Sequence, residues 1–389
     1  MTGGSSCKYA IQRRIHVLES SVRFSPMNVY PLIFEPIFKS RVWGGRNLAS
    51  RLGKKLPPGP IGESWELADL EADQSVVAIG PQKGRTLSQI VALWGGDLLG
   101  GAELSDGRFP LLLKFLDSQQ PLSVQVHPGL ASVMRFGPAA RLKNEAWYVI
   151  DATPDAWILR GVRPGTNSEA LRESLEAGTV EEVLHRISIR PGHAYYVPSG
   201  TVHALGPGAL IAEIQTPSDT TYRLYDWNRI DPMTNRPREL HMERGLESAV
   251  LDPIPAEAEH PEHVASVWTA ITRLIRSDSF VVERVRMVAG VEQLIPYDEM
   301  AAWMVLDGAG AISSDGWSEP IRFKVGDTVL LPAALKNGRV AIEGATTWLE
   351  ITLPVASSLH DLTRSERNSM RVDPRKNYVP LNIQNKTPD

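Results

Sequence analysis

The sequence predicts a mainly β protein made of antiparallel barrels of the jelly-roll type, with a small helical insert. Residues 187–229 contain short strand-like segments joined by Pro-Gly and Pro-Ser-Gly turns at regular spacing, a pattern typical of such barrels. Residues 268–353 alternate again between apolar and polar positions, as in FVVERVRMV. Helical periodicity is confined to a few short segments between these strand-rich regions.

The first strand pattern, VYPLIFEPIF, begins just after Met27. Residues 1–26 carry no apolar core of the kind that a secretory signal requires, and we expect them to form a flexible extension. Residues 28–81 have short apolar runs broken by Gly and Pro, which favours strands and loops. Thr86 then precedes a helical stripe of apolar residues and is a suitable N-cap.

Composition excludes several classes of partner. The 389 residues carry a formal charge of −4 and have a pI near 6.2, so no basic surface for nucleic acid is expected. No apolar run is long enough to cross a membrane. The single cysteine, Cys7, rules out an internal disulfide and fits a reducing compartment. We therefore expect a cytoplasmic protein.

The most informative stretch runs from Phe109 to Glu145. Gln125 and His127 lie two residues apart in a strand-like segment, so their side chains point to the same face. Glu145 opens the next strand-like run, and His203 lies between two further runs. Amide, imidazole and carboxylate groups on neighbouring strands of one barrel favour a divalent metal site.

A helical insert follows the central stretch. We expect one helix over Ser168–Glu176, with Asn167 as its cap and Gly178 after its end. A second helix is predicted from Thr179, which forms a capping-box pattern with Glu182. The insert then spans about 167–186.

The chain accordingly divides into a metal-binding domain, 27–260, and a second β domain, 261–353. Residues 239–260 are predicted to form a short helix and an acidic linker. Residues 264–359 contain no histidine, so we interpret the second domain as structural and without metal ligands. The polar tail, 354–389, is expected to be loosely held.

Several motifs in this order resemble the type I phosphomannose isomerases, which are zinc enzymes of the cupin superfamily. These are QVHP, KNEAWY, PSGTVHALG and SDTTYRLYDWNR, with GESWE upstream and FPLLLKFLD before the first of them. The resemblance covers about residues 28–353 and is strongest to the shorter bacterial form. It implies two cupin-type barrels, one zinc ion per chain and a small sugar phosphate as the ligand; we expect a monomer.

The resemblance also assigns roles to residues. The zinc ligands of the family fall on Gln125, His127, Glu145 and His203. Its active-site lysine, arginine, glutamate and serine fall on Lys143, Arg223, Glu213 and Ser123.

The implied reaction interconverts mannose 6-phosphate and fructose 6-phosphate through a cis-enediol. The base is either Glu213 or Lys143, and the residues do not decide between them. Arg223 suits either phosphate binding or stabilisation of the enediolate, because its fork binds oxyanions. Ser123, Lys143 and Arg223 are the expected substrate-binding residues.

Two other functions remain open. A cupin Fe(II) oxygenase also uses two histidines and one carboxylate, although Lys143 and Arg223 suit a sugar phosphate better than dioxygen. A non-catalytic regulator that binds a sugar phosphate is the alternative outside enzymes, and it predicts the loss of a ligand or of the arginine.

Overall fold

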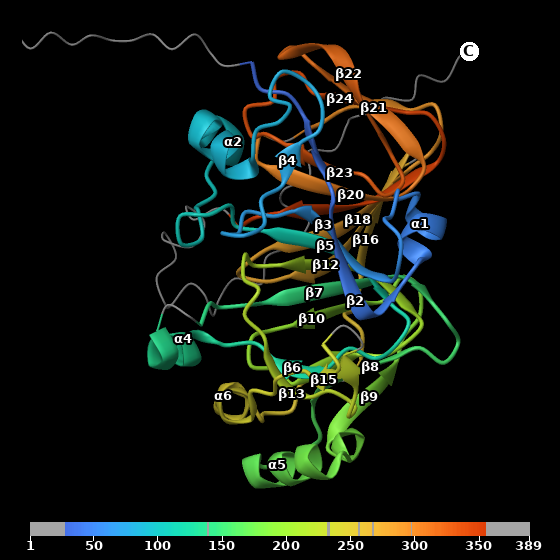
Figure 1. Cartoon of the computed structure of the whole chain (residues 1–389). Helices are drawn as coiled ribbons and strands as arrows, with labels where there is room; N and C mark the ends of the chain where they lie inside the picture. The colour runs from blue at the N-terminus through green and yellow to red at the C-terminus, as the bar shows by residue number, and fades with distance from the viewer. Residues whose placement is uncertain are drawn as a thin grey trace, which may run out of the picture.

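The computed structural model describes residues 28–137, 140–231, 234–255, 257–266, 268–296 and 298–354. The expected extension at 1–26 and the tail from residue 355 lie outside these residues. Figure 1 shows a mainly β molecule with short helices at its periphery. Within the described ranges, every helix is too short or too polar to cross a membrane.

A six-stranded and a five-stranded antiparallel sheet contain the central part of the chain. The first has the order β10-β7-β12-β5-β3-β2, with bounds Ala194–Val197, Glu145–Ala152, Ala209–Gln215, Leu112–Ser118, Ile61–Leu67 and Ile37–Gly45. The second has the order β13-β6-β11-β8-β9, with bounds Tyr222–Tyr225, Val124–Val126, His203–Leu205, Trp157–Val162 and Leu184–Ser188. A shared core of buried side chains, among them Trp147 and Leu205, joins the two sheets.

An eight-stranded and a four-stranded sheet contain most of the C-terminal part. The larger has the order β16-β17-β18-β25-β20-β23-β1-β4, with bounds Glu262–Ala265, Thr269–Arg276, Val281–Met287, Thr346–Thr352, Ala301–Asp307, Thr328–Leu331, Leu32–Glu35 and Val76–Val77. The smaller has the order β19-β24-β21-β22, with bounds Glu292–Leu294, Arg339–Ile342, Ala309–Ser314 and Trp317–Lys324. Trp303, Trp348 and Phe323 pack in the core between them.

The sheets cross the domain boundary that the sequence suggests. Strands β1 and β4 come from the N-terminal part of the chain but pair within the C-terminal sheet, β1 with β23 and with β4. A large core also contains residues of both parts, for example Phe115 and Leu349. Residues on both sides of position 260 therefore share one sheet and one core. The division into two domains and the two-barrel description both stay predictions.

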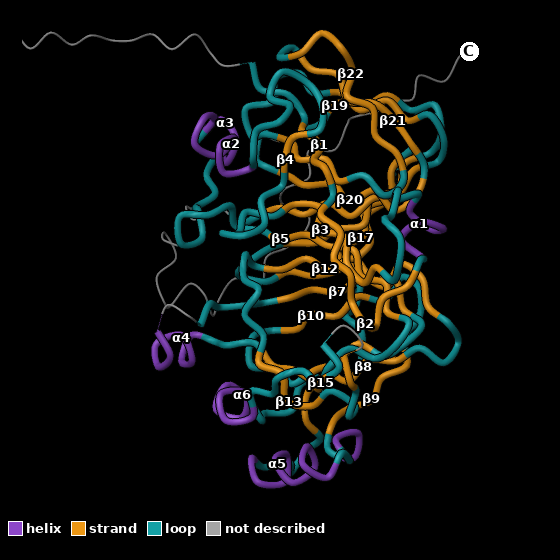
Figure 2. The backbone as a smooth tube through the Cα atoms, in the orientation of Figure 1, coloured by secondary structure: helices purple, strands orange, loops and turns teal. Residues whose placement is uncertain are grey.

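Short helices lie around the periphery of the sheets (Figure 2). They are α1 (Asn47–Leu52), α2 (Leu87–Trp94), α3 (Gly96–Leu99), α4 (Leu130–Phe136), α5 (Ser168–Ala177) and α6 (Met242–Ser248). Of these, α5 and α6 pack against one face of the five-stranded sheet. The predicted caps of α2 and α5 are confirmed: Thr86 forms a capping box with Gln89, and Asn167 accepts from the amide of Ala170. A small hairpin, β14 (Ile230–Asp231) with β15 (Arg236–Pro237), precedes α6.

The predicted second helix of the insert is wrong. Val180–Glu182 forms a single 3-10 turn, and Thr179 makes no side-chain cap. Strand β9 begins at Leu184 and pairs with β8, so the helical insert ends before residue 186. Pairing with β8 uses backbone groups that a continued helix would need, and this tertiary contact overrides the capping pattern.

Candidate metal centre and active site

Strand alternation directs three charged side chains toward the same interior. On β12, Leu210, Ala212 and Ile214 pack in the core shared with the eight-stranded sheet, whereas Ala209 and Ile211 face the five-stranded sheet. Because alternate residues of a strand point to opposite faces, Glu213 lies on the second face. The same parity holds for Lys114 on β5 and Glu145 on β7, whose neighbours Leu116 and Trp147 pack in that second core.

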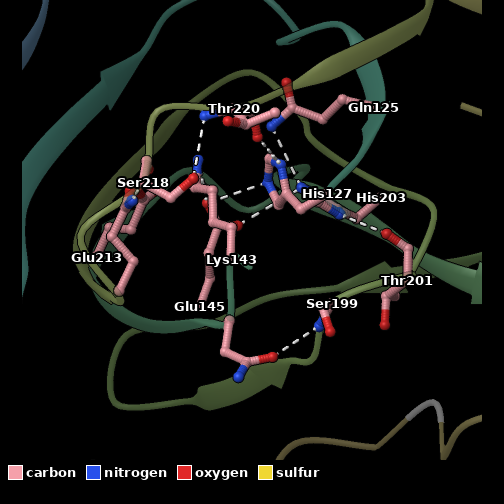
Figure 3. A network of polar contacts seen from close by, with 12 residues as sticks. Gln125, His127, Lys143, Glu145, Ser199, Thr201, His203, Glu213, Ser218 and Thr220 are labelled. Atoms are coloured by element: carbon pink, nitrogen blue, oxygen red, sulfur yellow. Dashed lines mark hydrogen bonds and ion pairs between the residues drawn. The ribbon is translucent and has the colours of Figure 1, made fainter. Parts of the chain in front are cut away.

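His127, Glu145 and His203 form a compact buried cluster between the two sheets (Figure 3). One ligand atom of each lies within 4.8 Å of the others, a spacing compatible with one metal ion. Nε2 of His127 is 3.1 Å from one oxygen of Glu145, and Nε2 of His203 is 3.5 Å from the other. All three side chains are buried. The structure therefore brings together three of the four ligands that the resemblance implies.

Backbone carbonyls orient both imidazole rings. Nδ1 of His127 lies 3.1 Å from the carbonyl oxygen of Thr220, and Nδ1 of His203 lies 2.8 Å from that of Thr201. Donation from Nδ1 leaves the lone pair of Nε2 directed at the cluster, as in histidines that bind metals. Burial lowers the pKa of both rings, that of His203 to about 3, so both are neutral and able to act as ligands.

Unpaired buried atoms mark the centre of the cluster as a place for a cation. Nε2 of His127 and Oε2 of Glu145 are buried and make no hydrogen bond within the described residues. Leaving such atoms unpaired costs about 1–3 kcal/mol each, whereas a divalent cation would coordinate both. Two neutral nitrogens and one carboxylate are donors that zinc accepts.

Gln125 completes the cluster from the neighbouring strand. It lies directly opposite His203 in the pairing of β6 with β11, and its amide nitrogen is 3.2 Å from Nε2 of that ring. Its amide oxygen is 3.4 Å from the hydroxyl of Ser123. Since the oxygen and nitrogen of an amide exchange places by a half-turn, Gln125 can offer an oxygen to a cation at this position.

Lys143 approaches the cluster from the loop before β7. Its ammonium group is 2.8 Å from the same oxygen of Glu145 that faces His127, and the side chain is buried. Burial alone would raise the pKa of Glu145, but Lys143 and the other polar neighbours of the carboxylate hold it well below the usual range. The carboxylate is therefore ionised and available as a ligand.

Glu213 forms a buried ion pair with Lys114. The two residues are cross-strand partners of β12 and β5, and their charged groups are 3.2 Å apart. Burial raises the pKa of Glu213, with a contribution from Glu145, although Lys114 opposes the shift. A carboxylate with a raised pKa in a polar cavity is a candidate for general acid–base chemistry.

A cavity of about 400 Å³ lies beside the two histidines, and its lining includes Ser123, Gln125, Lys143, Glu145, Glu213 and Arg223. Arg223 lies opposite Gln125 in the pairing of β13 with β6. One of its terminal nitrogens donates to the carbonyl of Glu239 at 2.8 Å, and its Nε is buried without a hydrogen bond among the described residues. All the site residues expected from the sequence thus lie in or beside one cavity.

Five charged residues on the wall of this cavity were not singled out by the sequence reasoning: Arg41, Glu63, Lys114, Asp219 and Arg238. A signal existed for two of them. Lys114 lies within the apolar run FPLLLKFLD and Glu63 within IGESWEL, and burying an ionised side chain in a strand is costly unless it is paired. Arg238 precedes a short helix in an otherwise polar segment, so nothing distinguishes it from an exposed arginine.

The fold and the cluster together define a mainly β protein with a buried two-histidine, one-carboxylate metal centre. Residues 32–147 match the family model of the phosphomannose isomerase type I catalytic domain. The chain is 40% identical over 321 residues to mannose-6-phosphate isomerase ManA of Bacillus subtilis, covering 82% of this chain and 97% of that protein. It is 35% identical to mannose-6-phosphate isomerase of Streptococcus mutans, covering 79% of this chain and 94% of that one.

Solved structures agree. The crystal structure of mannose 6-phosphate isomerase from Bacillus subtilis superposes with a TM-score of 0.75 at 32% identity, covering 83% of this chain and 99% of that one. A zinc-bound mannose 6-phosphate isomerase shares the fold, with a TM-score of 0.65 at 17% identity and coverage of 83% and 99%. The chain belongs to the mannose-6-phosphate isomerase family.

Proposed function

We propose that this protein interconverts mannose 6-phosphate and fructose 6-phosphate at the cavity between the six- and five-stranded sheets. The observation that carries the proposal is the buried cluster of two neutral histidines and one ionised carboxylate, whose Glu145 also lines a cavity walled by lysine and arginine. An oxygenase does not need several lysine and arginine side chains around its metal, whereas an enzyme that binds an anionic sugar phosphate does. All four proposed metal ligands and Arg223 are present, which argues against the non-catalytic regulator, because that alternative predicts the loss of one of them.

A single zinc ion is the proposed cofactor, held by Gln125, His127, Glu145 and His203. A structural relative is described as zinc-bound, and the donor set here suits zinc. When bound, such an ion acts as a Lewis acid toward oxygens that become negative during the reaction. Gln125 is a neutral ligand, so the site keeps more positive charge than it would with a second carboxylate.

The reaction moves one proton between C1 and C2 of the open-chain sugar through a cis-enediol, and we assign this transfer to Glu213. The pKa of Glu213 is raised toward neutral pH, and a group whose pKa lies nearer the working pH can both accept and return a proton. Lys114, 3.2 Å away, fixes its position. Lys143 is the alternative base, but its ammonium group is already paired with Glu145 at 2.8 Å.

The other residues bind and orient the substrate. Lys143, which lies 2.8 Å from Glu145, supplies positive charge that stabilises a developing enediolate more in the cavity than it would in water, and Arg223 supplies a fork that suits an oxyanion of the substrate. Ser123 is buried on the cavity wall beside Gln125 and can donate its hydroxyl proton to a sugar oxygen.

A coupled assay tests the proposal. Turnover of mannose 6-phosphate to fructose 6-phosphate should disappear with a chelator and return when zinc is added, and His193→Ala should leave it unchanged. Binding of the sugar phosphate by the metal-loaded protein without turnover would instead favour the regulator.

The cis-enediol has its own test. Turnover in D₂O should place deuterium at C2 of mannose 6-phosphate recovered before equilibrium, because a carboxylate base exchanges its proton with solvent. Complete retention of the original hydrogen at every extent of reaction would contradict proton transfer by Glu213 and favour a direct shift.

A further inference from the structure

Two arginines of different elements share the wall of the catalytic cavity. Arg223 comes from β13, and Arg238 from the segment between β15 and α6. They lie close enough to repel: burial lowers the pKa of Arg223, and Arg238 lowers it further. Holding two guanidinium groups together in a partly buried cavity is unfavourable unless an anion lies between them.

Asp226 holds Arg238 in this position. Nε of Arg238 donates to Oδ2 of Asp226 at 2.8 Å, and Nη2 donates to Oδ1 at 2.5 Å, the two-point geometry in which Arg and a carboxylate bind most firmly. Asp226 also accepts from Arg229 at 2.5 Å. It is buried, and the hydrogen bonds from Arg238 and Arg229 outweigh burial and lower its pKa.

The network of Asp226 leaves out Arg223. Asp226 binds Arg229 and Arg238, whereas Arg223 donates to a backbone carbonyl and keeps a buried Nε without a hydrogen bond among the described residues. The pair with Asp226 does not use Nη1 of Arg238. Among the described residues, Arg223 therefore makes no ion pair with a carboxylate, although Asp226 is near enough to act on its charge, and Arg238 is fixed beside it.

We propose that Arg238, positioned by Asp226, binds the phosphate group of the substrate together with Arg223 and so selects phosphorylated over free sugars. This inference rests on the proposed function, because it assigns the phosphate end of the same substrate. A phosphate monoester carries up to two negative charges and oxygens that suit the planar fork of arginine. Arg238 touches substrate directly, whereas Asp226 acts through Arg238 and is a positioning residue.

The two roles predict different kinetic effects. Arg238→Gln removes a group that binds the phosphate in the ground state and the transition state alike, so KM for mannose 6-phosphate should rise at least tenfold while kcat changes less than about threefold. Asp226→Asn keeps Arg238 but loosens it, and we expect a smaller rise in KM. Arg238→Lys should recover part of the affinity lost in Arg238→Gln, because charge returns without the two-point pairing.

Calorimetry with inorganic phosphate and with mannose 6-phosphate, on the full-length zinc-loaded protein, measures binding without turnover. Both ligands should bind at least tenfold more weakly to Arg238→Gln, and free mannose should bind equally to both proteins. Arg236→Gln is the matched control, since Arg236 is an exposed arginine two residues away and should change nothing.

The outcomes separate this inference from the proposed function. Unchanged phosphate affinity in Arg238→Gln would overturn the inference, even if the wild type interconverts the sugar phosphates. Equal losses for phosphate and free mannose would also overturn it, because they would indicate general damage to the cavity. If Arg238→Gln loses phosphate affinity relative to a wild type that binds phosphate but does not turn over the sugar, the phosphate site is supported and the isomerase is rejected.

Discussion

The two pairs of sheets fill their interiors with different chemistry. Between the six- and five-stranded sheets the interior holds ionisable side chains that are almost inaccessible to solvent, such as Lys114, Glu145 and Glu213. Between the eight- and four-stranded sheets it holds aromatic side chains, and the ring centroids of Trp303 and Trp348 lie 4.6 Å apart. Similar strand alternation thus supports a polar cavity in one pair and an aromatic core in the other.

The C-terminal interior also opens into a cavity, of about 730 Å³, which is larger than the catalytic one. Its charged residues include Glu283 and Glu350, but residues 264–359 contain no histidine. The presence of a large cavity therefore does not explain why only one of the two interiors has a candidate metal site. They differ in whether neutral nitrogen donors and an ionised carboxylate converge within the range of one cation, as they do only at His127, Glu145 and His203 among the described residues.

The largest effect should come from removing a histidine of the cluster. In His203→Ala and His127→Ala we expect zinc content and turnover to fall together, turnover by well over 100-fold, because each ring is one of only four proposed metal ligands. Metal analysis and the coupled assay measure both quantities. Stoichiometric zinc retained by both variants would remove these residues from the ligand set.

The buried ion pair of the catalytic interior should show its cost when it is broken. Lys114→Met leaves Glu213 buried without its cation and should lower the free energy of unfolding by about 3–5 kcal/mol. Adding Glu213→Gln should recover much of that loss, although the double variant should be inactive. Urea unfolding of the wild type, both single variants and the double variant forms a complete cycle; strict additivity would contradict the pairing.

The sequence predicts the parts of this site that depend on one strand at a time. The spacing of Gln125 and His127 fixes their common face, and the apolar pattern around Glu213 marks it as an unusual buried carboxylate. Partnerships between strands are different, because they depend on register. Nothing in either strand alone indicates that Lys114 lies opposite Glu213.

The same reason explains what sequence reasoning missed in the fold. Strand β1 reads as a strand, but its hydrogen-bonding groups do not specify β23, which lies almost three hundred positions later. At Thr179 the local capping pattern is present, yet the following residues form a short turn and then pair with β8. Local signals therefore predicted element type, while the choice of partner came from the packed structure.

Acid should weaken the catalytic interior through Glu63. Burial opposes ionisation of Glu63, but Lys114 and Arg41 lower its pKa from 4.5 to about 2. The unfolded state therefore binds this proton first as pH falls, and the stability that Glu63 contributes is present above pH 4.5 and lost toward pH 2. Between pH 6 and pH 3 the wild type should lose about 2 kcal/mol more than Glu63→Gln. Urea unfolding at both pH values tests this; equal losses would contradict it.

Glu299 in the C-terminal cavity should behave with the opposite sign. Burial and the nearby Asp298 and Glu283 raise its pKa, so the folded state holds its proton more tightly than the unfolded state. Its contribution favours folding below the ordinary carboxyl range and is lost as pH rises through the raised pKa. Glu299→Gln should therefore remove a loss of stability on raising pH from 4 to 7. A steeper loss in this variant would reverse the assignment.

The smallest effect should come from a pair of like charges in the C-terminal sheet. Glu283 and Glu350 are direct cross-strand partners of β18 and β25, and both line the C-terminal cavity. Like charges in this position destabilise a sheet, and Arg273 lies 2.9 Å from Glu283. Glu350→Gln keeps an oxygen for the indole of Trp348, which is 3.5 Å away. We therefore expect the free energy of unfolding to rise by about 0.2–1 kcal/mol, and the exposed control Glu319→Gln to leave it unchanged. A lower free energy of unfolding in Glu350→Gln would mean that this carboxylate stabilises the C-terminal interior, as the ion pairs stabilise the cavity between the six- and five-stranded sheets. The two interiors would then differ only in the presence of the histidines.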